Sequence, residues 1–484
     1  MKRLLSFVVC SLITASFLAQ GHNIKVKISG IKDTVCYLAG YYGPKQYYKD
    51  TVDVDSQGNM IFKGTDELPG GIYSVVLPDK QTYFEFIVTE QNFSLETVKG
   101  NQSEMNEKMK VKNSEDNRLF FEYLKFISDK QILAAKYRDV LQDTTGAKTP
   151  EKEKEARDAL TKIDEDVKAY KAKFMETHKQ SFVSKIFRTS EEPEVPETPM
   201  LENGQKDSLF PRRYYMAHYW DGVDFSDERL LRTPVFHGKL SRYFEKIVLQ
   251  HPDSINIAAD YVVEKSKANK EMFKYVVHYI TNTYEKSNLM GMDAVFVHMA
   301  ENYYSKDQAF WVDSAQLAKI AERVRKTKPT LIGKRTPNVI LQDTTESKWY
   351  NLYDVTAEYT ILYFWDPSCG HCKKETPKLK TLYEKVKDKG VEVFAVCTEF
   401  ETPDWKKYVR ENDLNWINVS DNPEINKNAV KYLQFTTLES LNFRDTYDIY
   451  STPRVFLLDA DKKILAKRIG VEQLEEILEH KLKK

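Results

Sequence analysis

The sequence FWDPSCGHCKKETP, residues 364–377, decides the fold of the C-terminal part of this chain. It overlaps the end of the apolar run YTILYFW at 359–365, which predicts a buried strand, and a helical pattern follows it over 372–389. Cys369 is therefore expected where a helix begins, and there the free backbone N–H groups and the helix dipole favour a thiolate over a thiol. Cys372 lies one turn later on the same side, so the two cysteines can form a disulfide with each other.

Cysteines spaced Cys-x-x-Cys occur in redox centres, in zinc sites and as structural disulfides. In a redox centre, Cys369 would attack a substrate disulfide and Cys372 would resolve the mixed disulfide. A structural zinc site needs four Cys or His ligands, usually as two close pairs, whereas Cys36 and Cys397 are single and far apart. A thiol peroxidase would have threonine three residues before its reactive cysteine, where this chain has Asp366. We therefore interpret the pair as a redox-active disulfide that needs no other cofactor, expect no metal site, and keep the peroxidase as a weaker alternative.

Strand and helix patterns alternate over residues 329–484. A hairpin is predicted at 338–354, further buried strands at 391–397 and 454–460, and a last helix from Val471. Alternation of this kind predicts an α/β sheet with parallel strand pairs.

Two segments of this region resemble the thioredoxin superfamily: YFWDPSCGHCKKETPKL at 363–379 and YSTPRVFLLD at 450–459. Within that superfamily they are most similar to the envelope thiol–disulfide oxidoreductases of the TlpA/ResA type. The resemblance covers about residues 330–484. The separated features that carry it are Trp365, Cys369, Cys372, Pro377, Thr452, Pro453 and Gly470. It implies a thioredoxin-like domain in this part of the chain.

The resemblance also implies a role for individual residues. Cys369 would be the attacking nucleophile and Cys372 the resolving thiol. Pro453 would be a cis-proline facing the disulfide, and Thr452 would offer backbone hydrogen bonds to a bound substrate chain. Glu375 matches a glutamate that assists proton transfer in the TlpA/ResA type, so we count it with the two cysteines as catalytic.

Three further residues are predicted to contact substrate, namely Trp365, Gly370 and His371. The Gly-His pair between the cysteines is the same dipeptide that protein disulfide isomerase carries, and an imidazolium beside Cys369 would stabilise its thiolate. The sequence departs from thioredoxin at one position, because Tyr363 stands where thioredoxin has a buried aspartate. The resemblance therefore leaves the proton relay to another group, for which Glu375 is the candidate.

The N-terminus, residues 1–21, has the pattern of a cleaved signal peptide. Lys2 and Arg3 precede an apolar run over 4–18, and small residues suited to cleavage follow at 19–21. The apolar run is shorter than the roughly 20 residues that a membrane-spanning helix needs. We therefore expect export to the periplasm or cell envelope of a bacterium with an outer membrane.

The remaining sequence is predicted to form two further domains. Residues 22–100 contain short runs rich in Val, Ile, Tyr and Phe, separated by Gly, Pro, Asp and Asn, which predicts a small antiparallel sandwich or sheet. Residues 101–328 have helical periodicity, with a loop near 189–205 that contains several prolines and acids. The formal net charge of the 484-residue chain is +0, which argues against a dedicated nucleic-acid binder.

The chain is thus predicted to be multidomain, with an antiparallel β domain, a central all-α domain and, over 329–484, an α/β thioredoxin-like domain. Its predicted function is to reduce or rearrange disulfides as an exported protein disulfide oxidoreductase. Its partners would be disulfide- or thiol-containing envelope proteins and an upstream membrane electron donor or acceptor, and no nucleic acid is expected. The alternative is a non-catalytic protein-binding module built on a thioredoxin scaffold.

Overall fold

The computed structural model describes residues 21–143, 149–399 and 402–483. All of the predicted signal peptide except Gly21 lies outside the described residues. The chain divides into two compact units, one made of Met1–Val248 and Ser266–Met272, the other of Leu249–Lys265 and Phe273–Lys484. The helical region that was expected as a single domain is therefore divided between the two units.

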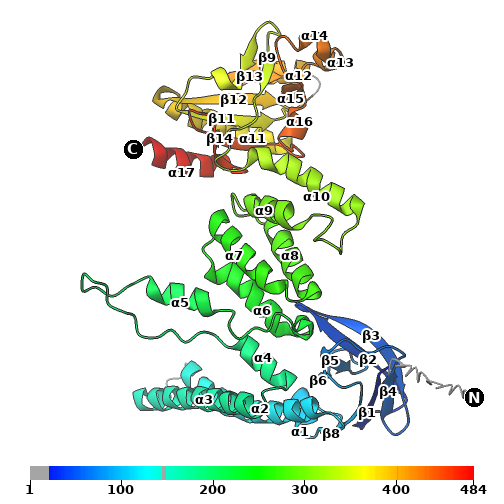
Figure 1. The fold of residues 1–484 in the computed structure, drawn as a ribbon. Coiled ribbons are helices and arrows are strands. Elements are labelled where there is room, and N and C mark those ends of the chain that lie inside the picture. The colour runs from blue at the N-terminus through cyan, green and yellow to red at the C-terminus, as the bar shows by residue number, and fades with distance from the viewer. Residues whose placement is uncertain (1–20, 144–148, 400–401, 484) are drawn as a thin grey trace, which may run out of the picture. The chain divides into compact units, whose positions relative to one another are not determined.

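The first unit contains two four-stranded sheets. Their strands are β1 (Asn23–Ser29), β2 (Thr34–Tyr42), β3 (Lys45–Val54), β4 (Asn59–Lys63), β5 (Gly71–Val76), β6 (Tyr83–Val88), β7 (Asn92–Val98) and β8 (Lys110–Lys112). One sheet has the order β4–β1–β7–β8 and the other β3–β2–β5–β6 (Figure 1). In β1, buried Ile24, Val26 and Ile28 alternate with more exposed residues, as expected for a strand with one face in the core.

The β domain differs from the prediction in two ways. Strands β1 and β7 pair in parallel, with Val26 opposite Leu95, although an antiparallel domain was expected. Strand β8 also lies beyond residue 100, the expected end of this domain, and pairs with β7. Both sheets contribute to one core cluster, in which Leu38 and Phe84 of one sheet join Val26 and Leu95 of the other, so the sandwich architecture is confirmed.

All of the helices of the first unit except the first follow the sheets along the chain. They are α1 (Gln102–Glu107), α2 (Glu115–Gln142), α3 (Pro150–Thr177), α4 (Phe182–Ser190), α5 (Phe210–His218), the 3₁₀ helix η1 (Glu228–Arg232), α6 (Pro234–Arg242) and the π-helical turn η2 (Tyr243–Ile247). Side-chain oxygens of Ser114 and Thr149 accept hydrogen bonds from the first turns of α2 and α3, which explains where these helices begin. The predicted proline-rich loop has no helix over 191–199.

The second unit begins with helices. These are α7 (Pro252–Ser266), α8 (Lys270–Glu285), α9 (Asp293–Tyr303), α10 (Ser314–Thr327) and the 3₁₀ turn η3 (Lys328–Thr330). A capping box between Asp313 and Gln316 starts α10. Farther along α10, Arg323 pairs with Asp448 at 2.5 Å. This contact is part of the reason that these helices belong to the same unit as the C-terminal domain.

The C-terminal domain is built on a seven-stranded sheet. Its strands are β9 (Ile340–Asp343), β10 (Trp349–Asn351), β11 (Tyr359–Trp365), β12 (Val391–Cys397), β13 (Ile417–Ser420), β14 (Arg454–Leu458) and β15 (Ile464–Lys467). Its helices and 3₁₀ turns are η4 (Leu352–Asp354), α11 (Gly370–Val386), η5 (Lys387–Lys389), α12 (Thr402–Glu411), α13 (Pro423–Lys427), α14 (Ala429–Tyr432), α15 (Leu438–Leu441), α16 (Phe443–Thr446) and α17 (Val471–Leu482).

The strand order is β10–β9–β13–β12–β11–β14–β15, with β11 in the interior of the sheet. Strand β11 pairs in parallel with β12 and antiparallel with β14. The predicted α/β thioredoxin-like domain is therefore confirmed, including the hairpin of β9 and β10.

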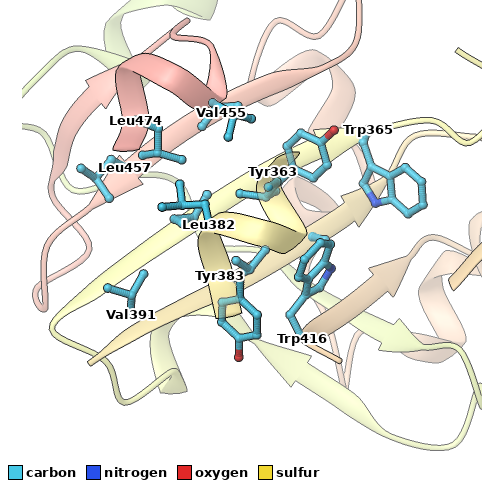
Figure 2. Close-up of a cluster of buried hydrophobic side chains, with 14 of the residues drawn as sticks. Tyr363, Trp365, Leu382, Tyr383, Val391, Trp416, Val455, Leu457 and Leu474 are labelled. Carbon is cyan, nitrogen blue, oxygen red and sulfur yellow. The ribbon is translucent and has the colours of Figure 1, made fainter. Parts of the chain in front are cut away.

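Strand β11 supplies side chains to both faces of the sheet. Tyr363 and Trp365 belong to the cluster that α11 and α17 cover, whereas Leu362 and Phe364 belong to the cluster on the opposite side. Figure 2 shows the first cluster, with labelled side chains Tyr363, Trp365, Leu382, Tyr383, Val391, Trp416, Val455, Leu457 and Leu474. This packing fixes α11, and with it the Cys-x-x-Cys motif, against the sheet.

Among the described residues, no helix is both long and apolar enough to cross a membrane.

Candidate active site

Cys369 lies directly before helix α11, as its N-cap residue. Its backbone is extended there, and the carbonyl oxygen of Cys369 already accepts a hydrogen bond from Lys373 N at 3.0 Å. Before it, the side chain of Asp366 accepts hydrogen bonds from the backbone N–H and hydroxyl of Ser368 at 2.7 and 2.6 Å. These bonds hold the turn between β11 and α11, which presents the Cys369 thiol at the start of the helix.

The two thiols of the motif have different environments. Cys369 is partly exposed, and its Sγ lies 3.4 Å from the carbonyl oxygen of Thr452. Cys372 is completely buried in the cluster under α11, and its Sγ accepts a hydrogen bond from Asp366 N at 3.5 Å. None of the four cysteines among the described residues is paired in a disulfide in this structure.

The environments move the two pKa values in opposite directions. Burial by itself would raise the pKa of Cys369, but hydrogen bonds from the Thr452 side chain and from the N–H groups of Cys372 and His371 outweigh it, so the pKa is lowered. Burial is the main cause that raises the pKa of Cys372 to about 12, and the neighbouring Cys369 adds to it. The outer thiol is thus suited to attack and the inner one to remain protonated until it is needed.

The loop before β14 faces Cys369. The peptide bond between Thr452 and Pro453 is cis, as the resemblance to thioredoxins implied. Both residues are partly exposed, and the contact between Thr452 O and Cys369 Sγ places this loop against the outer thiol. Gly370 and His371 are exposed at the start of α11, so these four residues and Cys369 form one accessible surface.

Trp365 is not part of this accessible surface. Its side chain is completely buried, its ring is stacked on Tyr363 with centroids 6.3 Å apart, and it is tilted against Tyr408 at 5.3 Å. We had expected it among the substrate-binding residues. In this structure it belongs to the core, because the odd-numbered side chains of β11 point toward α11.

Glu375 lies one turn after Cys372 on α11 and is held by two other groups. Its Oε1 accepts from Lys378 Nζ at 2.8 Å, and its Oε2 accepts from the backbone N–H of Val471 at 3.3 Å. Val471 is the first residue of α17, where a helix dipole favours a carboxylate. Neither of these hydrogen bonds involves a cysteine.

Two hydroxyl groups lie near the buried thiol: that of Tyr363, which stands where thioredoxin has its buried aspartate, and that of Thr376, which was not predicted. The Tyr363 hydroxyl lies 3.0 Å from Thr376 Oγ1, and both residues are buried. Burial chiefly raises the pKa of Tyr363, and the nearby Cys372 contributes to the shift. Thr376 could have been found from helical spacing, because it follows Cys372 by four residues on the same helix. For Tyr408, the sequence has no local signal that places it against Trp365.

Cys397 ends β12 and is completely buried in the same cluster as Cys372. Burial raises its pKa above the ordinary value. Among the described residues, no group of three or more His, Cys, Asp or Glu side chains is placed to hold a metal ion.

Three family models match the chain. Residues 332–467 match the AhpC/TSA family, residues 142–328 match a domain of unknown function (DUF5106), and residues 22–120 match another such domain (DUF4369). These matches cover the C-terminal α/β domain, the helices and the β sandwich, respectively.

Curated relatives match the C-terminal part. Thiol-disulfide oxidoreductase ResA of Bacillus cereus is 33% identical over 153 residues, which are 32% of this chain and 78% of the relative. ResA of Bacillus subtilis is 28% identical over 133 residues, or 28% of this chain and 64% of the relative. Among solved structures, a domain of a possible thiol-disulfide isomerase from Cytophaga hutchinsonii is 42% identical and covers 32% of this chain and 95% of that chain, with a TM-score of 0.27.

Proposed function

The chain belongs to the ResA-like thiol–disulfide oxidoreductases of the thioredoxin superfamily, and we propose that it reduces or rearranges disulfides of envelope proteins through Cys369 and Cys372. The observation that carries this proposal is the asymmetry of the two thiols. Cys369 is accessible beside the loop of Thr452 and Pro453 and has a lowered pKa, whereas Cys372 is buried and has a raised one. An accessible thiolate backed by a second thiol is the arrangement that two-step disulfide exchange needs.

The proposed reaction has two exchange steps. The Cys369 thiolate attacks a substrate disulfide, a new S–S bond forms between enzyme and substrate, and the first substrate sulfur leaves as a thiolate. Cys372 then loses its proton and attacks Cys369 Sγ, which releases the second substrate sulfur and leaves a disulfide between the two enzyme cysteines. Two electrons pass to the substrate, and no cofactor besides this cysteine pair is invoked.

A membrane electron donor would reduce the pair again, and a membrane acceptor would serve if the chain works as an oxidant. We place this chemistry in the periplasm or cell envelope, because residues 1–21 have the pattern of an export signal. An oxidising compartment is also where disulfide-containing partner proteins occur.

Capture of partners tests the proposed function. The substitution Cys372→Ala removes the resolving thiol, so the first exchange step should stop at a mixed disulfide between Cys369 and a partner. We expect envelope proteins in these adducts, detected by non-reducing electrophoresis and mass spectrometry. The matched control is Cys372→Ala combined with Cys369→Ser, which should capture none. Absence of adducts from Cys372→Ala would contradict the oxidoreductase and favour a non-catalytic binding module.

We further propose that Glu375 accepts the proton that Cys372 must lose. It follows Cys372 by three residues on α11, a spacing that brings side chains together on one face of a helix. With a pKa raised to about 12, Cys372 needs a base before it can attack the mixed disulfide. Reaching it would require Glu375 to leave Lys378 or Val471 during this step.

The substitution Glu375→Gln should therefore slow resolution of the mixed disulfide on the order of 10²-fold, a usual effect for a general base. The rate of the first attack by Cys369 should not change, and quenched-flow mass spectrometry can follow the two steps separately. Glu472→Gln is the matched control, because Glu472 is the other carboxylate on Lys378, at 2.6 Å. An unchanged resolution rate in Glu375→Gln would remove Glu375 from the mechanism.

A further inference from the structure

A cavity of about 280 Å³ lies in the second unit near the loop of the cis-proline. One side is the segment 287–291, which connects α8 to α9. Asp293, Arg454, Lys467 and Arg468 contribute charged side chains to its lining. We call this cavity the arginine pocket, because its two arginines carry the argument below.

Only one of the three cations in the pocket has a carboxylate partner in the lining. Lys467 is almost completely buried, forms an ion pair with Asp293 and donates a hydrogen bond to Thr330 O at 2.6 Å. Asp293 Oδ2 is thereby engaged, whereas its Oδ1 is buried and has no hydrogen-bond partner among the described residues. Arg468 is exposed, and its side chain has no ion pair with any of the residues that the structure describes.

Arg454 is the less satisfied of the two arginines. Its Nη2 donates to Ser451 Oγ at 3.1 Å, but its Nε is buried and has no hydrogen-bond partner in the described part of the chain. Burial lowers the pKa of Arg454, and the positive charge of Arg468 lowers it further. Asp448 opposes this shift. Its Oδ2 pairs with Arg323 at 2.5 Å, and its Oδ1 is buried without a hydrogen-bond partner in the described part of the chain.

This arrangement has a cost that an anion would offset. A buried donor without a partner costs roughly 1–3 kcal/mol, and more when the group is charged. Two like charges beside one cavity add repulsion. An oxyanion between Arg454 and Arg468 would neutralise the repulsion between the two guanidinium groups, which match the geometry of carboxylates especially well.

The pocket is close to the redox centre along the chain. Arg454 directly follows the cis bond of Thr452 and Pro453. Ser451, which accepts the hydrogen bond from Arg454, precedes Thr452, whose carbonyl oxygen contacts Cys369 Sγ. The loop that contacts the outer thiol therefore leads within two residues to Arg454, which lines the arginine pocket.

We propose that the arginine pocket binds a carboxylate side chain of the disulfide substrate, within a few residues of the half-cystine that Cys369 attacks. This inference rests on the proposed function and adds a substrate class to it, namely disulfides with a nearby acidic residue. A free anion could occupy the same arginines, but the neighbouring substrate loop favours a carboxylate carried by the substrate itself.

The test compares two oxidised peptides that differ in one residue. Each contains a single disulfide, and one has Glu and the other Gln at a position two or three residues from the half-cystine. The reduced full-length chain is mixed with each peptide, and the second-order rate constant of exchange is measured. We expect the Glu peptide to react roughly tenfold faster, the size of one charge-assisted hydrogen bond.

Variants then assign this preference to the pocket. Arg468→Gln and Arg454→Gln should each remove most of the preference for Glu. Lys463→Gln removes the same charge at the opposite end of the β14–β15 hairpin, where Lys463 is exposed, and should keep the preference. Thermal unfolding of each variant verifies that it is folded, so a loss of preference in Arg468→Gln alone still supports the assignment.

The outcomes separate the possible failures. Equal rates for the two peptides in the unmodified chain, or a preference that survives both arginine substitutions, would overturn this inference and leave the oxidoreductase intact. No exchange with either peptide would overturn the proposed function itself. If inorganic phosphate binds to the chain in a titration while the two peptides react equally, the pocket holds a free anion, and the substrate carboxylate is excluded.

Discussion

Replacing Cys369 with serine is expected to lower the rate of disulfide exchange by at least 10³-fold, on the order of 4 kcal/mol in activation free energy. A serine hydroxyl does not ionise near neutral pH and does not displace sulfur from a disulfide, so the first step is lost. Cys397→Ala is the matched control, since Cys397 is buried in the same cluster but has no access to substrate. The measurement is reduction of an oxidised peptide by the prereduced chain.

The pH dependence of the first step gives a second check on the same thiol. The pKa of Cys369 is lowered, so the thiolate forms, and the rate should rise, at a pH below the value of about 8.5 for an ordinary cysteine. Above that pH the rate should stay level, because Cys372, with a pKa near 12, remains protonated. A rise centred at or above the ordinary value would mean that burial outweighs the hydrogen bonds to Cys369. Equal activity of Cys369→Ser and the unmodified chain would refute the mechanism altogether.

Local signals explain what the sequence could predict about this site. The apolar run of β11 and the helical pattern after it are continuous in sequence, so the position of Cys369 at the start of α11 could be predicted. The resemblance then implied the cis bond before Pro453, which the structure contains. The apolar run of β11 also indicates that Trp365 is buried. The predicted contact with substrate came instead from the position of Trp365 beside the Cys-x-x-Cys motif.

Long-range pairing explains what the sequence could not predict. The parallel pairing of β1 with β7 joins segments that are more than sixty residues apart, and no local pattern specifies it. The division of the helices between two units likewise depends on side chains such as Arg323 and Asp448, which meet only in the folded chain. The arginine pocket has the same origin, because Arg454 and Arg468 are brought together by the β14–β15 hairpin and closed by the segment 287–291.

Removing the Asp421 carboxylate is expected to lower the stability of the C-terminal sheet by about 3–5 kcal/mol, the usual effect of breaking a buried ion pair. The Asp421 side chain is 0% exposed and follows β13. Its two oxygens accept hydrogen bonds from Arg444 Nη1 and Nη2 at 2.6 and 2.8 Å, and Asn426 donates another at 2.7 Å. Arg444 also donates to Thr398 O, just after β12, so the pair joins α16 to the ends of two central strands.

Amide hydrogen exchange in peptides from β11 and β12 measures this effect, because it reports the opening free energy of the sheet without requiring the whole chain to unfold in one step. Asp421→Ala should raise exchange rates there by roughly 10²- to 10⁴-fold, which is the same loss of stability at about 1.4 kcal/mol per factor of ten. Asp413→Ala is the matched control, because Asp413 is 73% exposed and lies 3.8 Å from Lys380, a pair worth about 1 kcal/mol or less.

A double substitution identifies the physical cause. If the cost of Asp421→Ala arises from leaving the positive charge of Arg444 without its carboxylate, then Asp421→Ala combined with Arg444→Met should be less destabilising than Asp421→Ala alone. If it arises instead from lost hydrogen bonds to the ends of β12 and β13, the double variant should be at least as unstable, since Thr398 O then loses its donor as well. The first result would make charge compensation the reason that this aspartate is needed beneath α16.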